Sequence, residues 1–213
     1  MSTSSSSKSR PRGRPTLSEQ EMAEARRHIA DCALRLFQEH GYDAVSMRRL
    51  AGEAGCTVMT LYRYFERKID ILRTLWAEVF AELFELLDKV AAGESDPLQR
   101  LESVALAYVD FWLRHRERYF LVFMSSGVSQ SDVSVFVGDD GLAQRFGLFR
   151  TCLSEALGAG CSEKDLALKE QLLLCALHGT AHNLITISAY PWAAPDQLVR
   201  AAVSGILKAD PAA

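Results

Sequence analysis

The stretch SMRRLAGEAGCTVMTLYRYF, residues 46–65, holds two short apolar helical patterns separated by a glycine. Ser46 and Thr57 are each placed to cap the first turn of a helix, because a hydroxyl oxygen accepts from the free backbone N–H groups there. The pattern predicts helices at about 46–54 and 57–64 with a tight turn between them. Such a pair forms a helix-turn-helix unit, although the same spacing also occurs in plain helical bundles.

The second of these helices would turn polar and basic side chains away from its support. Leu61 and Phe65 are expected to face inward. In a DNA-binding unit the second helix enters the major groove, where hydroxyl and arginine groups suit base edges and phosphates and methyl groups suit thymine. The residues that we predict to contact DNA here are Ser46, Arg48, Arg49, Thr57, Val58, Met59, Thr60, Tyr62, Arg63, Tyr64 and Lys68.

Helical periodicity continues on both sides of this unit, and no pairing of strands is evident. Ser18 and Glu21 have the spacing of a capping box, which marks the start of a helix that ends at Gly41. The segment 125–140 is β-branched and contains glycine, so we predict a loop there. The fold class is therefore expected to be all-α, with further helices at about 67–91, 97–115, 116–126, 141–158, 163–189 and 196–208.

Residues 33–72, ALRLFQEHGYDAVSMRRLAGEAGCTVMTLYRYFERKIDIL, resemble the DNA-binding domain of the TetR family of bacterial transcription regulators. The resemblance extends over about residues 24–84, and Met59 departs from it because the family usually has glycine there. The positions that match the family pattern are Phe37, Gly41, Tyr42, Ser46, Leu50, Ala51, Ala54, Gly55, Thr60, Leu61, Tyr62, Tyr64, Phe65, Lys68, Asp70 and Leu72.

The resemblance implies three parts along the chain. Residues 1–17 are rich in serine, proline and basic residues and are expected to form a disordered basic arm. Residues 18–84 would form a three-helix DNA-binding head, and residues 85–213 a helical domain for ligand binding and dimerisation. Residues 1–75 carry 13 Lys and Arg against 9 Asp and Glu, whereas the rest carries 11 against 18, so only the front is suited to a polyanion.

The arm contains the sequence RPRGRP at residues 10–15, which resembles the core of an AT-hook. Glycine would allow the backbone to lie deep in a narrow minor groove, with arginines spread along its floor. The other reading is a solvated basic tail that adds nonspecific attraction to phosphates. In either case we predict that Arg12 and Arg14 contribute to DNA binding.

Regulators of this family pair through their last long helices and hold a small molecule in the C-terminal domain. Helix 163–189 is apolar nearly all round, as expected of a helix buried on more than one side. For a twofold interface we predict Leu173, Leu177, Ala181, Leu184, Leu198, Ala202 and Ile206. For a pocket that takes an apolar or aromatic ligand we predict Phe84, Tyr108, Phe111, Trp112, Tyr119, Phe123, Phe146, Phe149 and His178, each of which could instead be ordinary core.

Other classes of function have weaker support. Cys175, His178 and His182 share one helix face, but core or interface histidines are favoured over a metal site because no H-E-x-x-H arrangement accompanies them. The five cysteines contain no C-x-x-C pair, and there is no secretory signal or membrane-length apolar run, so we expect a cytoplasmic protein with reduced thiols. Because no catalytic motif or nucleotide-binding loop occurs, we predict no catalytic residues and no cofactor.

The sequence thus predicts a homodimeric, ligand-responsive DNA-binding regulator on a palindromic operator. Repression is the default expectation, since a dimer bound at a promoter most simply blocks polymerase. The alternative is a helical small-molecule-binding protein or enzyme whose DNA-binding head is inert. The two differ in whether Arg48, Arg49, Arg63 and Lys68 contact phosphates.

Overall fold

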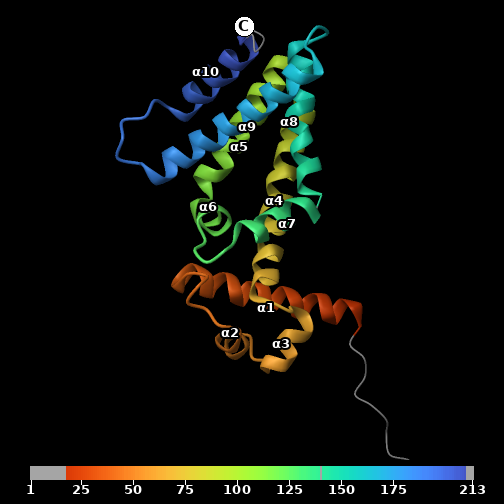
Figure 1. Ribbon diagram of the computed structural model, residues 1–213, viewed down its shortest axis with the longest axis vertical. Coiled ribbons are helices and arrows are strands. Elements are labelled where there is room, and N and C mark those ends of the chain that lie inside the picture. The colour runs from red at the N-terminus through yellow and green to blue at the C-terminus, as the bar shows by residue number, and fades with distance from the viewer. Residues whose placement is uncertain (1–17, 140, 210–213) are drawn as a thin grey trace, which may run out of the picture.

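The computed structural model describes residues 18–139 and 141–209, and every regular element within them is an α-helix (Figure 1). The all-α prediction is confirmed, whereas the arm with Arg12 and Arg14 lies outside the described residues. None of the described helices is both long and apolar enough to cross a membrane. The helices are α1 (Glu19–His40), α2 (Met47–Glu53), α3 (Val58–Tyr64), α4 (Lys68–Gly93), α5 (Pro97–Arg114), α6 (Arg116–Phe123), α7 (Gln130–Asp139), α8 (Leu142–Leu157), α9 (Glu163–Thr186) and α10 (Pro195–Lys208).

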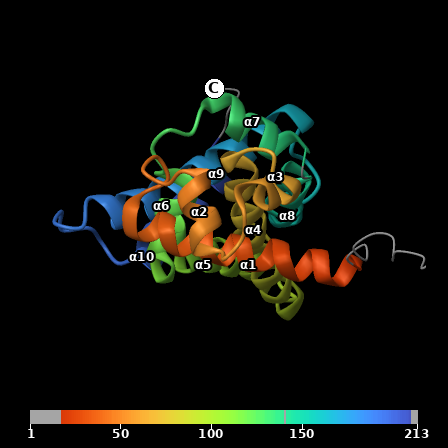
Figure 2. The same cartoon turned by 90° about the horizontal axis from the view of Figure 1, so that it is seen from below.

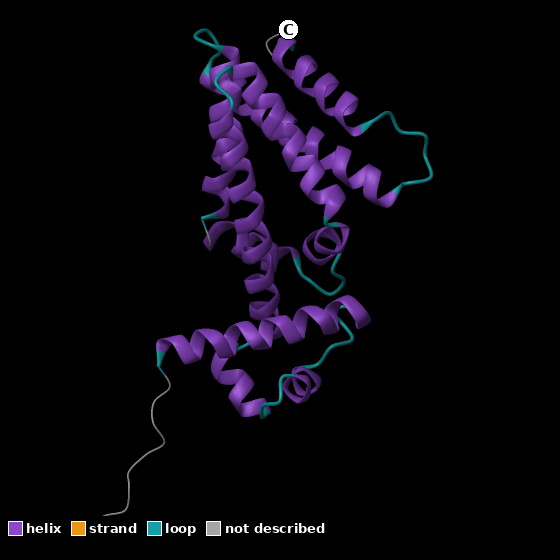
Figure 3. Ribbon diagram, turned by 180° about the vertical axis from the view of Figure 1, so that it is seen from behind, coloured by secondary structure: helices purple, strands orange, loops and turns teal. Residues whose placement is uncertain are grey.

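The helices form a small head and a larger body that share α4. In Figures 1 and 3, α1, α2 and α3 lie together at one end, and α4 runs from them into the body formed by α5 to α10. Figure 2 views the molecule from the head end, where α2 packs on both α1 and α3. Because α4 packs on α1 in the head and on α5 and α8 in the body, it runs continuously through both parts, and α6 of the body also packs on α1.

The head forms where the sequence predicts it because local caps define its helices. The Ser18 hydroxyl accepts from the backbone N–H of Glu21 at 3.2 Å, and the Glu21 carboxylate accepts from the N–H of Ser18 at 2.8 Å. Ser46 Oγ and Thr57 Oγ1 accept from backbone N–H groups at 3.2 and 3.1 Å, which starts α2 and α3. Gly55 between them has a φ of +65°, a conformation that glycine adopts without steric cost.

The prediction of a loop at residues 125–140 was wrong, because most of this segment is α7. Ser129 Oγ accepts from the N–H of Asp132 at 3.2 Å and so caps the helix. Phe136 is 3% exposed and packs edge-on against Trp76, with ring centroids 5.2 Å apart. The helical conformation of α7 is therefore supported by the burial of Phe136 against α4. The composition of the segment does not reveal this long-range contact.

A glycine in the connection between α6 and α7 gives a test of how this segment meets the head. Gly127 has a φ of +80°, and a Cβ built on it would lie 1.6 Å from Oδ1 of Asp43. We expect Gly127→Ala to lower the free energy of unfolding by about 1–2 kcal/mol, because left-handed backbone is costly for any residue with a Cβ. Urea denaturation measures this change.

The matched control is Gly147→Ala in the middle of α8, where an added methyl group meets no atom within 4 Å. There we expect a gain of about 0.5–1 kcal/mol, because alanine restricts the unfolded chain and favours helix. Two losses of equal size would contradict the assignment of strain to Gly127.

Candidate nucleic-acid interface and ligand cavity

The outer side of α3 is an exposed surface supported by buried residues beneath it. Leu61 and Phe65 are 0% and 2% exposed, so they face inward as predicted. Met59 is 79% exposed and Tyr62 49%, although both are large apolar or aromatic side chains. With the neighbouring Val58, which is 37% exposed, they form an exposed, largely apolar surface on this capped helix.

The basic side chains of the head differ in how exposed they are and in the contacts that they already make. Arg48 and Arg63 are exposed, and Arg49 is exposed with its guanidinium beside the ring of His40. Lys68 is half-buried: its ammonium donates to the carbonyl of Tyr42 at 2.7 Å and lies 4.0 Å from the centre of that ring. Burial lowers the pKa of Lys68. Its ammonium is therefore engaged in contacts within the head and is less available to bind a DNA phosphate.

The remaining predicted DNA contacts are mixed in exposure. Thr57 and Val58 are exposed, while Thr60 and Tyr64 are half-buried, and the hydroxyls of Thr57 and Thr60 lie 2.9 Å apart. The Ser46 hydroxyl is engaged in capping α2.

Sequence reasoning missed a residue that holds the end of α3. The guanidinium of Arg26 donates to the carbonyl of Tyr64 and lies 4.3 Å from the centre of the Phe65 ring. This residue comes from α1, so no pattern within α3 reveals it.

The body contains an apolar cavity of about 330 Å³ between α4, α5, α6, α7, α8 and α9. Four of the predicted pocket residues line it, namely Tyr108, Phe123, Phe146 and His178. Sequence reasoning did not predict the contributions of α7, nor that Trp76 of α4 and Leu142 of α8 complete the wall. The full lining is Trp76, Phe80, Tyr108, Val122, Phe123, Val133, Phe136, Leu142, Phe146, Leu174 and His178.

Four other predicted pocket residues are core residues behind this wall. Phe111, Trp112, Tyr119 and Phe149 are at most 3% exposed and do not line the cavity. Trp112 and Phe149 pack edge-to-face with rings that line it, as in the pair of Trp112 and Phe123 with centroids 5.1 Å apart. Periodicity marks all of these residues as inward but does not distinguish filled space from empty space.

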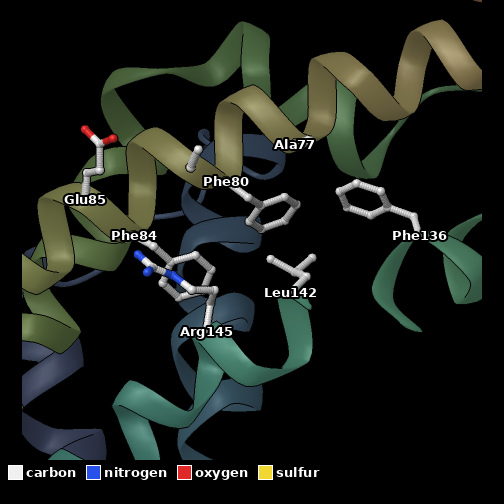
Figure 4. Close-up of a pocket in the computed structure, with 8 residues that line it drawn as sticks. Ala77, Phe80, Phe84, Glu85, Phe136, Leu142 and Arg145 are labelled. Atoms are coloured by element: carbon white, nitrogen blue, oxygen red, sulfur yellow. The ribbon is translucent and has the colours of Figure 1, made fainter. Parts of the chain in front are cut away.

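A second pocket of about 280 Å³ adjoins the cavity and contains the predicted residue Phe84. Both pockets are lined by Phe80, Phe136 and Leu142, which Figure 4 shows close together from three different helices. The second pocket also contains Glu85 and Arg145, so it is the charged neighbour of an uncharged cavity.

Polar groups gather where the cavity meets α9. Tyr119 Oη lies 2.8 Å from Nδ1 of His182 and 3.4 Å from Nε2 of His178. Burial raises the pKa of Tyr119 to about 12. Burial, and to a lesser degree the neighbouring His182, lowers the pKa of His178. In the described part of the chain no three His, Cys, Asp or Glu residues are arranged to hold a metal ion.

The lowered pKa of His178 predicts a loss of stability in mild acid. Above about pH 6.5, the ordinary pKa of histidine, His178 is neutral in both the folded and the unfolded chain. Below it the unfolded chain takes up a proton more readily than the folded chain, so acid favours unfolding. Urea denaturation at pH 7.5 and 5.5 should show a smaller loss for His178→Phe than for the parent protein. The same substitution at exposed His28 should leave the loss unchanged, and equal losses for all three proteins would contradict this account.

The structure corrects the predicted twofold interface. Leu173, Leu177 and Ala181 are 0% exposed within a single chain, so they face its own core and cannot meet a second copy. The outward side of α9 instead carries Leu168 and Leu172, each 43% exposed. The other predicted interface residues, Leu184, Leu198, Ala202 and Ile206, are half-buried.

Comparison with known proteins gives matches to both parts of the chain. Residues 29–75 match the family model of bacterial regulatory proteins of the tetR family, and residues 101–206 match that of the tetracyclin repressor-like C-terminal domain. The chain is 32% identical over 104 residues to the HTH-type transcriptional regulator AcrR of Shigella flexneri, covering 48% of each chain. It is 37% identical over 109 residues to the HTH-type transcriptional repressor KstR of Rhodococcus jostii, covering 49% of this chain and 50% of that one.

The chain thus spans about half the length of these curated relatives. Solved structures are similar over more of the fold. The fatty acid degradation regulator FadR from Bacillus halodurans superposes with a TM-score of 0.68 at 19% identity, covering 86% of this chain and 95% of that one. A TetR/AcrR-family regulator from Thermobifida fusca superposes with a TM-score of 0.60 at 21% identity, covering 87% and 97%. At these identities the superpositions show the shared fold.

The first family model covers the head and the second covers most of the body, in the same order along the chain. The relatives that it resembles in sequence are named as regulators of transcription. The chain belongs to the TetR family of bacterial transcription regulators.

Proposed function

We propose that this DNA-binding regulator is a ligand-responsive repressor that binds a palindromic operator as a homodimer. The observation that carries the proposal is the exposed side of α3, where Met59, Tyr62 and Arg63 stand outward on a helix that is capped at its start and buried beneath. In this proposal α3 enters the major groove, and Arg48 and Arg49 of α2 contact the phosphates beside it.

The experiment that tests DNA recognition is a selection of bound sequences from random duplex DNA. A palindromic motif should be enriched, and the affinity for the winning sequence should fall steeply as salt rises, because bound cations leave the phosphates when the protein binds. If no motif is enriched and only weak, salt-sensitive binding remains, the head is inert and the function of the chain resides in the body.

Substitution of Arg63 tests the contact residues directly. We expect Arg63→Ala to weaken binding to the selected operator by about tenfold, because one contact to a base edge or phosphate contributes about 1–3 kcal/mol. Fluorescence anisotropy with labelled operator measures it. Arg114→Ala is the control, since Arg114 is likewise exposed, lies on the body and pairs with Asp110 at 2.7 Å. Equal losses for the two variants would show that general charge, and not position, explains the effect.

For the dimer, the supporting feature is the apolar surface that α9 and α10 leave uncovered. Leu168 and Leu172 of α9 are exposed, and half-buried Leu198, Ala202 and Ile206 lie on α10, which packs along α9. A second copy related by a twofold axis could cover the same surface on both chains. The outward leucines thus replace the buried ones of the sequence-based prediction.

The coupling between ligand and DNA would run through α7 and α4. Val133 and Phe136 of α7 line the cavity, and Asp132 in the same helix accepts from Arg73 of α4 at 3.3 Å. Arg73 also lies 3.7 Å from Asp70, whose carboxylate accepts from the N–H of Arg67 at 2.9 Å and so caps the start of α4. This start follows directly after α3. A ligand that displaces α7 would therefore change the contacts that support the recognition helix.

A further inference from the structure

We propose that the cavity takes an uncharged, largely apolar ligand with one hydroxyl group, and that this hydroxyl donates a hydrogen bond to His178. The inference rests on the proposed ligand response and names the chemical class of the ligand. Three observations carry it: the absence of charge in the cavity lining, the hydrogen bonds of Tyr119, and the lack of a second selective polar group.

The lining of the cavity favours an uncharged ligand. Of its eleven residues, His178 is the one with a side chain that can become positively charged near neutral pH. Burial and the neighbouring His182 disfavour that charge. The nearest basic side chain in the adjoining pocket, Arg145, already pairs with Asp88 at 2.8 Å, and Glu85 lies in the same pocket. A carboxylate or ammonium group placed in the cavity would lose its hydration without gaining a partner, which is costly.

The hydrogen bonds of Tyr119 determine what His178 can offer. Tyr119 remains a phenol at neutral pH, so its single proton can be donated once. The shorter contact, 2.8 Å to Nδ1 of His182, is the better place for that proton. We therefore assign the tautomer of His178 in which Nε2, 3.4 Å from the same oxygen, carries the proton and donates to it. A neutral imidazole has one N–H, so Nδ1 of His178 is left as an acceptor, and an acceptor selects a ligand that donates.

The other polar groups that line the cavity do not distinguish a ligand that donates a hydrogen bond from one that accepts. The indole N–H of Trp76 donates to the carbonyl of Leu121 at 3.1 Å and is satisfied within the protein. Tyr108 is buried, which raises the pKa of its phenol, and a phenol can either donate or accept. His178 is therefore the group that distinguishes a ligand hydroxyl from an ether or a carboxylate on the same ring system.

The cavity volume of about 330 Å³ lies in the range of small-ligand sites. Three naphthalene derivatives that differ in one substituent test the proposal. Isothermal titration calorimetry of the full chain would compare 2-naphthol, 2-methoxynaphthalene and 2-naphthoate. We expect 2-naphthol to bind about tenfold more tightly than 2-methoxynaphthalene, which lacks the donor, because a buried acceptor left without a partner loses its hydration. The carboxylate should bind most weakly of the three.

Substitution of His178 locates the preference. His178→Phe should bind 2-methoxynaphthalene as the parent does and should lose the advantage of 2-naphthol. His28→Phe, an exposed site on α1, should retain the full advantage. Equal binding of the two uncharged compounds by the parent protein, or tighter binding of 2-naphthoate, would overturn the proposal.

Operator binding is measured in parallel so that the two proposals can fail separately. If 2-naphthol binds with the expected preference but the operator affinity is unchanged, the cavity inference holds and this compound does not elicit the proposed ligand response. If the selected operator binds tightly while none of the three compounds binds, the cavity inference is overturned and the DNA-binding function stands.

Discussion

Replacing Trp112 with alanine is expected to lower the free energy of unfolding by about 3–5 kcal/mol, the usual range for removing a large aromatic side chain from a core. Trp112 is 0% exposed and packs edge-to-face with Phe80, Tyr119 and Phe123, with centroids 5.9, 5.7 and 5.1 Å apart. These rings come from α4 and α6, so the indole of α5 joins three helices behind the cavity. Urea denaturation at fixed protein concentration measures the loss.

Trp192 provides the matched control because it is the same residue type in a different environment. It lies in the connection between α9 and α10, is half-buried, and packs at a tilt against Tyr190 with centroids 4.4 Å apart. Trp192→Ala should cost less than about 1 kcal/mol, as is usual for substitutions away from the core. If the two tryptophans cost the same, Trp112 does not have the central packing role that its burial indicates.

The second large effect is expected at the proposed dimer surface. Leu172→Asp should raise the dimer dissociation constant by about a hundredfold or more, because a twofold axis would bury two unpaired carboxylates in one apolar contact. Dilution experiments in the analytical ultracentrifuge measure the constant. Operator affinity should fall as well, since a single head contacts half of a palindrome.

Leu86→Asp is the control for this experiment. Leu86 is 38% exposed on α4, a helix that packs on α1, α5, α6 and α8. Its substitution should leave the dissociation constant unchanged. Dissociation caused by Leu86→Asp, with a stable dimer retained by Leu172→Asp, would place the interface on the side of α4 instead.

The parts of the fold that the sequence predicts well are those determined locally. Ser18, Ser46 and Thr57 cap their helices through backbone groups three residues away, so spacing along the chain is enough to find them. In α7 the decisive contact is between Phe136 and Trp76, sixty positions apart, whereas the β-branched residues and glycine of the segment disfavour helix. Contacts over such distances are invisible to a pattern of neighbouring residues.

The same reason limits prediction of the sites. Helix α9 is apolar on several sides, and only its packing against α5, α8 and α10 determines that Leu173 and Leu177 are buried while Leu168 and Leu172 remain exposed. Lys68 matches the family pattern, yet its ammonium is occupied by the carbonyl of Tyr42 from a distant turn. Residue type predicts which chemistry is possible, and the neighbours decide whether it is available.

The continuity of α4 gives the chain a lever of fixed length. Ile71 and Leu72 anchor it in the head, Phe80 stands at the cavity, and its one glycine, Gly93, is its last residue. At about 1.5 Å per residue, Phe80 lies roughly 18 Å from the start of the helix, so a tilt of about 5° would displace that end by about 1.6 Å. Hydrogen bonds to base edges tolerate only about 0.5 Å. The leverage of a ligand would thus depend on how far along α4 it binds as well as on how tightly.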